Sequence, residues 1–223
     1  MRSWGNRPDT FVCDEPLYAH YLLTTRVPHP GADEVIRSQE TDWRKVVEWL
    51  TGFAPPGKAV FYQKHMTHHL LPHLDRGWLD DVTNAFLIRE PGEVVTSFAK
   101  IAGTPKLEDT GLVRQLEIFN WVRARSGRIP PVVDARDVLE NPARVLRLLC
   151  DSLDVEFTEA MLSWPPGPRD TDGVWAKHWY DSVLKSTTFQ AYKPKSEPAP
   201  PHMADLLREA EDIYKQLHEF RLR

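Results

Sequence analysis

FLIREPGEVVTSF, residues 86–98, is the stretch of sequence that decides the fold of this chain. The run over residues 84–90 is β-prone, and Pro91 directly after it suits the first position of a helix. Apolar residues then recur at helical spacing. The stretch therefore predicts a strand that feeds a helix, with Arg89 closing the strand and Ser97 about two turns along the helix.

The same alternation of strand and helix continues on both sides of this stretch. Two further strands are predicted over residues 59–65 and 130–137, and three further helices over residues 112–125, 143–153 and 158–164. Such a chain is expected to form an α/β fold, a parallel sheet flanked by helices. Ligands of these sheets bind at the carboxyl ends of the strands, which here carry Lys64 and His65, Arg89, and Asp134 to Arg136.

Arg89 and Ser97 suit a phosphate group. A guanidinium binds phosphate through two parallel hydrogen bonds, and the backbone N–H groups at a helix start favour the same anion. The alternative interpretation is a structural arginine paired with Glu90 or Glu93, with Ser97 on a solvated face of the helix.

Composition limits the partners that we expect. The chain has 223 residues and a net charge of -4, which gives no basic field for nucleic acid or an anionic membrane. The amino terminus has no apolar signal segment and no apolar run is long enough to span a bilayer, so we expect a cytoplasmic protein. Cys13 and Cys150 lack metal or redox spacing. The sequence does not indicate an oligomeric state.

We expect one α/β domain over residues 1–192, a Pro-rich connector over residues 193–202, and a packing helix of the same domain over residues 203–223. The connector reads KPKSEPAPPH, and its prolines forbid a continuous helix. The last segment has apolar residues at helical spacing, which favours packing against the body of the domain.

Several segments in order resemble the sulfotransferases that use 3′-phosphoadenosine-5′-phosphosulfate (PAPS). Arg89-Glu90-Pro91 with Ser97 resembles their 3′-phosphate motif, and residues 132–162 resemble the strand, turn and Asn-Pro helix that follow it. FVCDEPLYAHYL and VFYQKHMTHHLLP look like the acceptor-side segments. The resemblance implies a three-layer P-loop-like architecture, PAPS as the donor, and a hydroxylated small molecule or carbohydrate as the acceptor.

One part of the family pattern is not found. Members begin with a strand and a Pro-Arg-Ser-x-Ser-Thr loop that wraps the 5′-phosphosulfate, whereas this chain opens with Met1-Arg2-Ser3-Trp4, where the helix after that loop is expected. We therefore expect either that the protein starts upstream or that the chain is a truncated relative. In the second case it is a catalytically inactive nucleotide-binding or interaction module.

The resemblance offers two bases for the acceptor's proton. His65 is the first choice, because it closes a strand and an unperturbed imidazole titrates near neutrality. Lys64 beside it is a candidate for stabilising charge on the bridging oxygen. Glu15 is the competing base, in a segment whose secondary structure its pattern does not determine, and its alternative role is a helix-start carboxylate.

Two further groups carry weaker signals. DGVWAKHWYDSVLKSTTF, residues 172–189, resembles the family's nucleotide-covering loop, so Trp175 and Lys177 are candidate nucleotide contacts, with ordinary packing of the tryptophan as the alternative. The histidines of residues 65–73 raise a zinc hydrolase as a third hypothesis. The sequence lacks the glutamate of a metalloprotease motif there, and we expect no metal.

Overall fold

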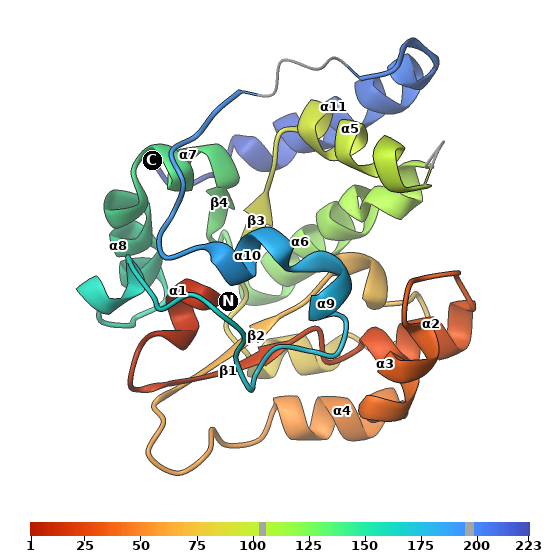
Figure 1. Ribbon diagram of the computed structural model, residues 1–223. Helices are drawn as coiled ribbons and strands as arrows, with labels where there is room; N and C mark the ends of the chain where they lie inside the picture. The colour runs from red at the N-terminus through yellow and green to blue at the C-terminus, as the bar shows by residue number, and fades with distance from the viewer. Residues whose placement is uncertain (103–105, 195–198) are drawn as a thin grey trace. The chain divides into compact units, whose positions relative to one another are not determined.

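The computed structural model describes residues 1–102, 106–194 and 199–223 (Figure 1). They form two compact units, one of Met1–Asp81 and Thr158–Phe189, the other of Val82–Phe157 and Gln190–Arg223. The described residues hold two two-stranded sheets, one in each unit, and both pair in parallel. Helices flank each pair, so the predicted α/β fold with parallel strands is confirmed.

The first unit is built on β1 (Thr10–Asp14) and β2 (Val60–Lys64). Its other elements are α1 (Arg2–Gly5), α2 (Tyr18–Thr25), α3 (Ala32–Ser38), α4 (Trp43–Leu50), η1 (Thr67–His69), η2 (Gly77–Asp81), η4 (Glu159–Met161), α9 (Ala176–Trp179) and α10 (Asp181–Lys185). Alternate residues of β1, namely Thr10, Val12 and Asp14, are buried. This alternation is the period of a strand with one covered face.

Strand β2 confirms the strand predicted over residues 59–65, whereas β1 lies in the segment whose secondary structure the sequence left open. The parallel register aligns Thr10 with Val60 and Asp14 with Lys64, so the two strands end together. The α-helix expected over residues 158–164 is replaced by a short 3-10 helix, η4.

The second unit is built on β3 (Phe86–Ile88) and β4 (Val132–Asp134). Its other elements are α5 (Pro91–Ala102), η3 (Leu107–Thr110), α6 (Leu112–Ser126), α7 (Ala135–Glu140), α8 (Pro142–Ser152), η5 (Pro201–Met203) and α11 (Ala204–His218). Phe86 pairs with Val132 and Ile88 with Asp134. As the sequence predicted, Pro91 is the first residue of α5 and follows soon after the end of β3.

The core of the second unit lies between its strands and the helices α5, α6 and α11. The Phe86 ring meets Phe119 of α6 edge to face, with centroids 5.4 Å apart, and Leu217 of α11 is fully buried. The terminal packing helix expected over residues 203–223 is therefore present. The connector over residues 193–202 is described only in part, because residues 195–198 lie outside the described residues.

Within the described part of the chain, no helix combines the length and the hydropathy needed to cross a membrane.

Candidate active site

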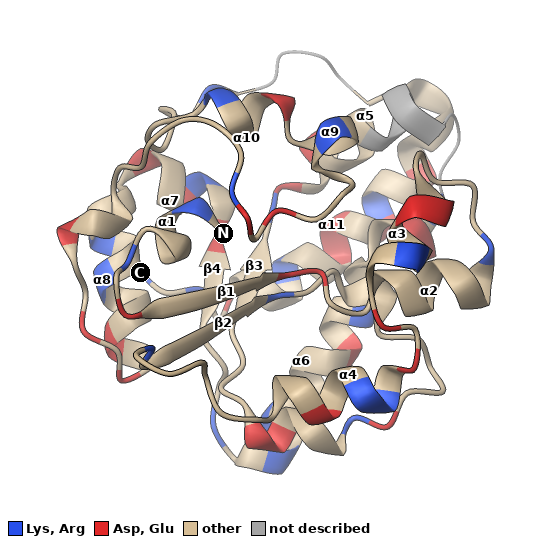
Figure 2. Cartoon of the chain, turned by 60° about the horizontal axis from the view of Figure 1, so that its bottom comes forward, with Lys and Arg blue, Asp and Glu red and all other residues tan. Residues whose placement is uncertain are grey.

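The two strands of the first unit bring charged side chains to one edge. Asp14 and Lys64 are the last residues of β1 and β2, and Glu15 follows directly, with its N–H donating to the Lys64 carbonyl at 2.8 Å. Figure 2 shows acidic positions at the tip of the β1 arrow. Parallel pairing has thus placed two carboxylates and an ammonium group at the edge where α/β folds bind ligands.

The backbone holds Glu15 in an unusual conformation. Its φ is +47°, in the left-handed region, although it is not glycine and precedes Pro16. Its carbonyl accepts hydrogen bonds from the Tyr18 N–H at 3.0 Å and from Gln39 Nε2 at 3.2 Å. Left-handed backbone costs a residue with a Cβ about 1 to 2 kcal/mol. These contacts offset that cost and fix the direction in which the carboxylate leaves the chain.

Four side chains form what we call the strand-end cluster: Asp14, Glu15, Lys64 and Tyr180. The Lys64 ammonium donates to a Glu15 carboxylate oxygen and lies 3.4 Å from Asp14 Oδ1. The Tyr180 hydroxyl donates to Asp14 Oδ2 at 2.5 Å and lies 3.4 Å from Lys64 Nζ. The cluster therefore places one cation between two anions, beside a hydroxyl that is a hydrogen-bond donor.

Burial changes the acid–base properties of the cluster. It raises the pKa of Glu15 above its ordinary value, and the opposing attraction of Lys64 does not cancel the effect. Burial acts to lower the pKa of Lys64, but Glu15 and Asp14 together raise it. Lys64 therefore stays charged near neutral pH, and Glu15 becomes a more basic carboxylate than one in water.

His65 has a less basic environment than the sequence suggested. Burial, together with the charge of Lys64, lowers its pKa to about 4. Its Nε2 lies 3.3 Å from Gln63 Oε1, its ring packs on Trp78, and its buried Nδ1 has no hydrogen-bond partner among the described residues. The sequence argument used the unperturbed pKa of an imidazole, which does not include this burial. With its pKa lowered in this way, His65 is a weaker base than an imidazole in water.

The nearby histidines contact aromatic rings and one another, and His68 and His69 have ring centroids 4.5 Å apart. His69 stacks on Tyr18, with ring centroids 4.6 Å apart, and His73 Nε2 lies 3.1 Å from His20 Nε2. Among residues 1–102, 106–194 and 199–223, no group of three or more His, Cys, Asp or Glu side chains could hold a metal ion. The contacts of these histidines give the zinc hydrolase hypothesis no geometric support.

In the second unit, Arg89 follows β3 at the carboxyl edge. Its Nε and one terminal nitrogen both lie 2.9 Å from Glu93 Oε2, and the Tyr192 hydroxyl donates to the other Glu93 oxygen at 3.1 Å. The arginine side chain is 48% exposed, and Ser97 is half-buried on α5. The pairing with Glu93 is the one that the alternative interpretation named. The phosphate role of Arg89 and Ser97 stays a prediction.

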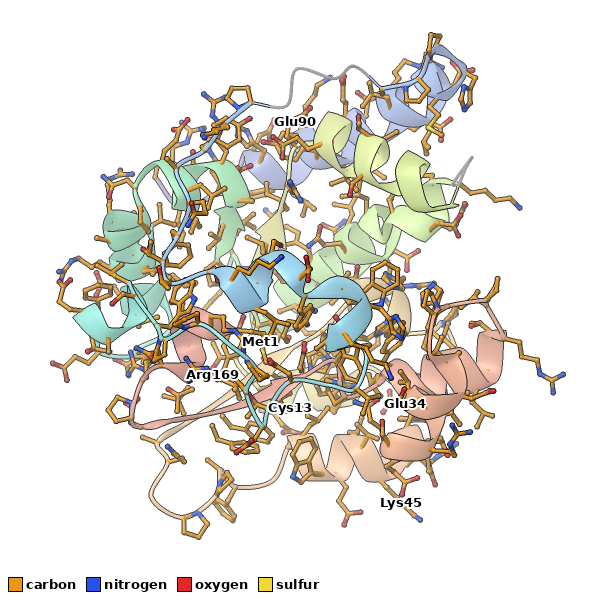
Figure 3. The ribbon with its side chains drawn as sticks, in the orientation of Figure 1. Met1, Cys13, Glu34, Lys45, Glu90 and Arg169 are labelled. Carbon is orange, nitrogen blue, oxygen red and sulfur yellow. The ribbon has the colours of Figure 1, made fainter. Side chains whose placement is uncertain are left out.

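Trp175 and Lys177 lie in the first unit, on the segment that resembles the nucleotide-covering loop. Trp175 is 2% exposed and packs in a core cluster with Tyr18 and Val35. Lys177 forms an ion pair with Glu34, which Figure 3 labels on α3. These contacts match the packing alternative for the tryptophan, and a nucleotide role for either residue stays a prediction.

Sequence reasoning missed two members of the strand-end cluster, Asp14 and Tyr180. The Asp-Glu-Pro segment was a usable signal for Asp14, because it places two carboxylates before a helix start. Tyr180 carried no comparable signal, because 166 residues separate it from Asp14 in sequence.

The first unit is thus an α/β unit with a largely buried acid–base cluster at the carboxyl ends of its strands, the place where α/β sheets bind ligands. A model of the sulfotransferase domain family matches residues 1–220, and the chain belongs to this family.

Two proteins of Arabidopsis thaliana are similar to most of the chain. Branched-chain-amino-acid aminotransferase-like protein 2 is 33% identical and protein 1 is 35% identical, each over 97% of this chain. The chain spans only 38% and 39% of these two relatives.

Two solved structures are also similar. The sulfotransferase domain from the curacin biosynthetic pathway matches 93% of this chain and 79% of its own, with 16% identity and a TM-score of 0.42. The sulfotransferase domain from the Synechococcus PCC 7002 olefin synthase matches 97% of this chain and 96% of its own, with 15% identity and a TM-score of 0.45.

Proposed function

We propose that this chain is the sulfuryl-transferring part of a PAPS-dependent sulfotransferase whose acceptor is a hydroxyl of a small molecule or carbohydrate. Membership of the sulfotransferase domain family supports the reaction class. The strand-end cluster is the observation that carries the mechanism, because Glu15 and Lys64 supply a base and a cation side by side. The two named relatives are more than twice as long as this chain, and we do not extend their aminotransferase-like names to it.

In the proposed reaction, the acceptor oxygen forms a bond to the sulfur of PAPS. The bond between that sulfur and the bridging oxygen breaks, and its electron pair leaves with 3′-phosphoadenosine-5′-phosphate. The proton of the acceptor hydroxyl goes to Glu15. Transfers of this kind depend on a positioned base and on positive groups where negative charge develops.

Glu15 is the base that the geometry supports best. Its pKa is raised by burial while that of His65 is lowered to about 4, so the carboxylate has gained basicity and the imidazole has lost it. Lys64 is held next to Glu15 and would offset charge that develops on the transferring group. On the donor side, the exposed guanidinium of Arg89 and the hydroxyl of Ser97 are the groups we assign to the 3′-phosphate.

The test is transfer of radiolabelled sulfate from PAPS to a panel of phenols, alcohols and sugars by the natural protein that contains this chain. We expect Glu15→Gln to lower kcat about a hundredfold or more, the usual contribution of a positioned base, and His65→Ala to lower it much less. Nucleotide affinity should change little in both variants.

Two outcomes would contradict the proposal. Loss of turnover in His65→Ala with most turnover retained in Glu15→Gln would make His65 the base. Binding of 3′-phosphoadenosine-5′-phosphate without transfer to any acceptor would favour a nucleotide-binding module without catalysis.

A further inference from the structure

Residues 163–188 form a loop that is closed at its base. Ser163 and Thr188 make an antiparallel bridge, and the Trp164 N–H donates to the Thr187 carbonyl at 2.8 Å. Trp164 is 8% exposed, and its indole Nε1 donates to Ser186 Oγ at 3.0 Å. These hydrogen bonds therefore hold the two ends of the loop next to each other.

The interior of the loop is anchored to the rest of the first unit. Asp172 accepts two hydrogen bonds from the Arg2 guanidinium, at 2.7 and 2.8 Å, and both side chains are nearly buried. Trp175 packs into the core beside Tyr18, with ring centroids 5.2 Å apart. Tyr180, between α9 and α10, follows these anchors in the chain, so its position is set by buried contacts on the same loop.

Tyr180 meets the strand-end cluster through Asp14. Burial raises the pKa of Tyr180 well above its ordinary value, and the Asp14 carboxylate raises it further. The phenol therefore stays protonated and donates a hydrogen bond to Asp14. The Asp14 side chain is 1% exposed, so water cannot replace this donor. The Tyr180 ring also lies beside Lys64, with Nζ 5.9 Å from the ring centroid.

We propose that Asp14 and Tyr180 are positioning residues, which hold the Lys64 ammonium against the Glu15 carboxylate and so set the orientation and basicity of Glu15. Asp14 attracts Lys64 from one side and Tyr180 fixes the carboxylate of Asp14 from the other. The loop of residues 163–188 thereby completes the acid–base cluster from a distant part of the sequence. The catalytic part of this inference rests on the proposed function.

The proposal makes a signed prediction for pH dependence. The charge of Asp14 contributes to the raised pKa of Glu15, so its removal should lower that pKa. The base is active when deprotonated, so kcat/KM should rise with pH through the pKa of Glu15, and this rising part of the profile is its acid limb. In Asp14→Asn the acid limb should therefore move to lower pH. The charged and titratable groups that interact with Glu15 or Lys64 are Asp14, Tyr18, Tyr62, His65, His69, Tyr180 and the Met1 amino group.

The experiment compares Tyr180→Phe and Asp14→Asn with two control variants of exposed residues on the same loop, Asp181→Asn and Lys185→Met. One readout is steady-state kinetics against pH. We expect kcat to fall about tenfold or more in both test variants, with KM for PAPS changed less than about twofold. The acid limb should shift in Asp14→Asn and in neither control.

The second readout needs no turnover. The rate at which acetic anhydride modifies Lys64, followed by peptide mass spectrometry without substrate, should rise several-fold in both test variants, because the ammonium loses a contact that orients it or holds its proton. Circular dichroism shows which variants are folded, and Tyr180→Phe, which removes one oxygen, keeps the test available if Asp14→Asn is unfolded.

The outcomes separate the two proposals. Folded variants whose Lys64 is modified at the wild-type rate would overturn the positioning role, whatever the activity. A wild-type protein that transfers no sulfate, with faster Lys64 modification in the variants, would overturn the proposed function and leave the positioning role intact. A shift of the acid limb to higher pH in Asp14→Asn would also contradict the inference.

Discussion

Arg89 is the residue on which nucleotide recognition would depend most. Its guanidinium is paired with Glu93 on one side and is 48% exposed, so it is held in place while part of it remains accessible. Glu93 is itself fixed by the Tyr192 hydroxyl. An arginine oriented in this way loses less side-chain entropy when it binds a phosphate, which favours recognition of the 3′-phosphate at this position.

We expect Arg89→Ala to weaken binding of 3′-phosphoadenosine-5′-phosphate by about 2 to 3 kcal/mol, because a charge-assisted hydrogen bond to phosphate is lost. Isothermal titration calorimetry on the natural protein measures the change. Arg208→Ala is the matched control, since Arg208 is an exposed arginine of the same unit that is paired only on the surface with Asp205. Equal affinity in wild type and Arg89→Ala would exclude the assignment.

The relative basicity of His65 and Glu15 also belongs to the scale of single residues. From sequence, the histidine is the better base, because an unperturbed imidazole titrates near pH 7 and a carboxylate does not. In the structure burial removes water from both side chains, and loss of solvation favours the neutral form of each group. The same burial therefore weakens one base and strengthens the other.

Among the elements, the loop of residues 163–188 depends on Gly173 for its packing. A Cβ built on Gly173 would lie between 2.1 and 2.2 Å from three ring atoms of Trp175. That ring is buried in a core cluster with Tyr18 and Val35. Gly173 is therefore required for packing, and it allows the loop to lie directly over the indole.

We expect Gly173→Ala to lower the free energy of unfolding by about 2 to 3 kcal/mol, the upper part of the range for overpacking a core. Urea denaturation followed by tryptophan fluorescence measures it. Gly127→Ala is the comparison: Gly127 has φ +66° with nothing within 4 Å of its Cβ position, so it should lose only about 1 kcal/mol to backbone strain. A larger loss at Gly127 than at Gly173 would contradict this account of the loop.

For the whole molecule, one buried and three partly buried histidines predict a loss of stability in mild acid. Burial lowers the pKa of His29, His65, His69 and His218 below the ordinary value of 6.5. The unfolded chain then binds more protons than the folded chain, so the free energy of unfolding falls as the pH drops below about 6.5. Glu15 works in the opposite direction, because its folded pKa is raised.

His65 should contribute up to roughly 3 kcal/mol to this loss between pH 6.5 and about 4, if its pKa changes from the ordinary value to about 4 on folding. Denaturation curves at several pH values measure the slope, which should be shallower in His65→Gln than in wild type. His202→Gln is the control because His202 is exposed. An unchanged slope in His65→Gln would show that this imidazole is solvated in the folded protein.

The sequence by itself determined the family and the alternation of strand and helix. FLIREPGEVVTSF correctly predicted a strand followed by a helix that opens at Pro91, because these signals lie within a few residues of one another. The parallel pairing followed from the alternation, since parallel neighbours need a crossover connection. The resemblance that identified the family likewise rests on short motifs in order.

Only the tertiary structure decided how the candidate site is assembled. Asp14 and Lys64 become neighbours through strand register, and Tyr180 joins them through a loop anchored by Arg2 and Trp175. The pKa of a side chain depends on its burial and on charges from distant segments, which local sequence does not contain. The sequence could therefore name Glu15, Lys64 and His65 as candidates, while their relative basicity was set by the fold.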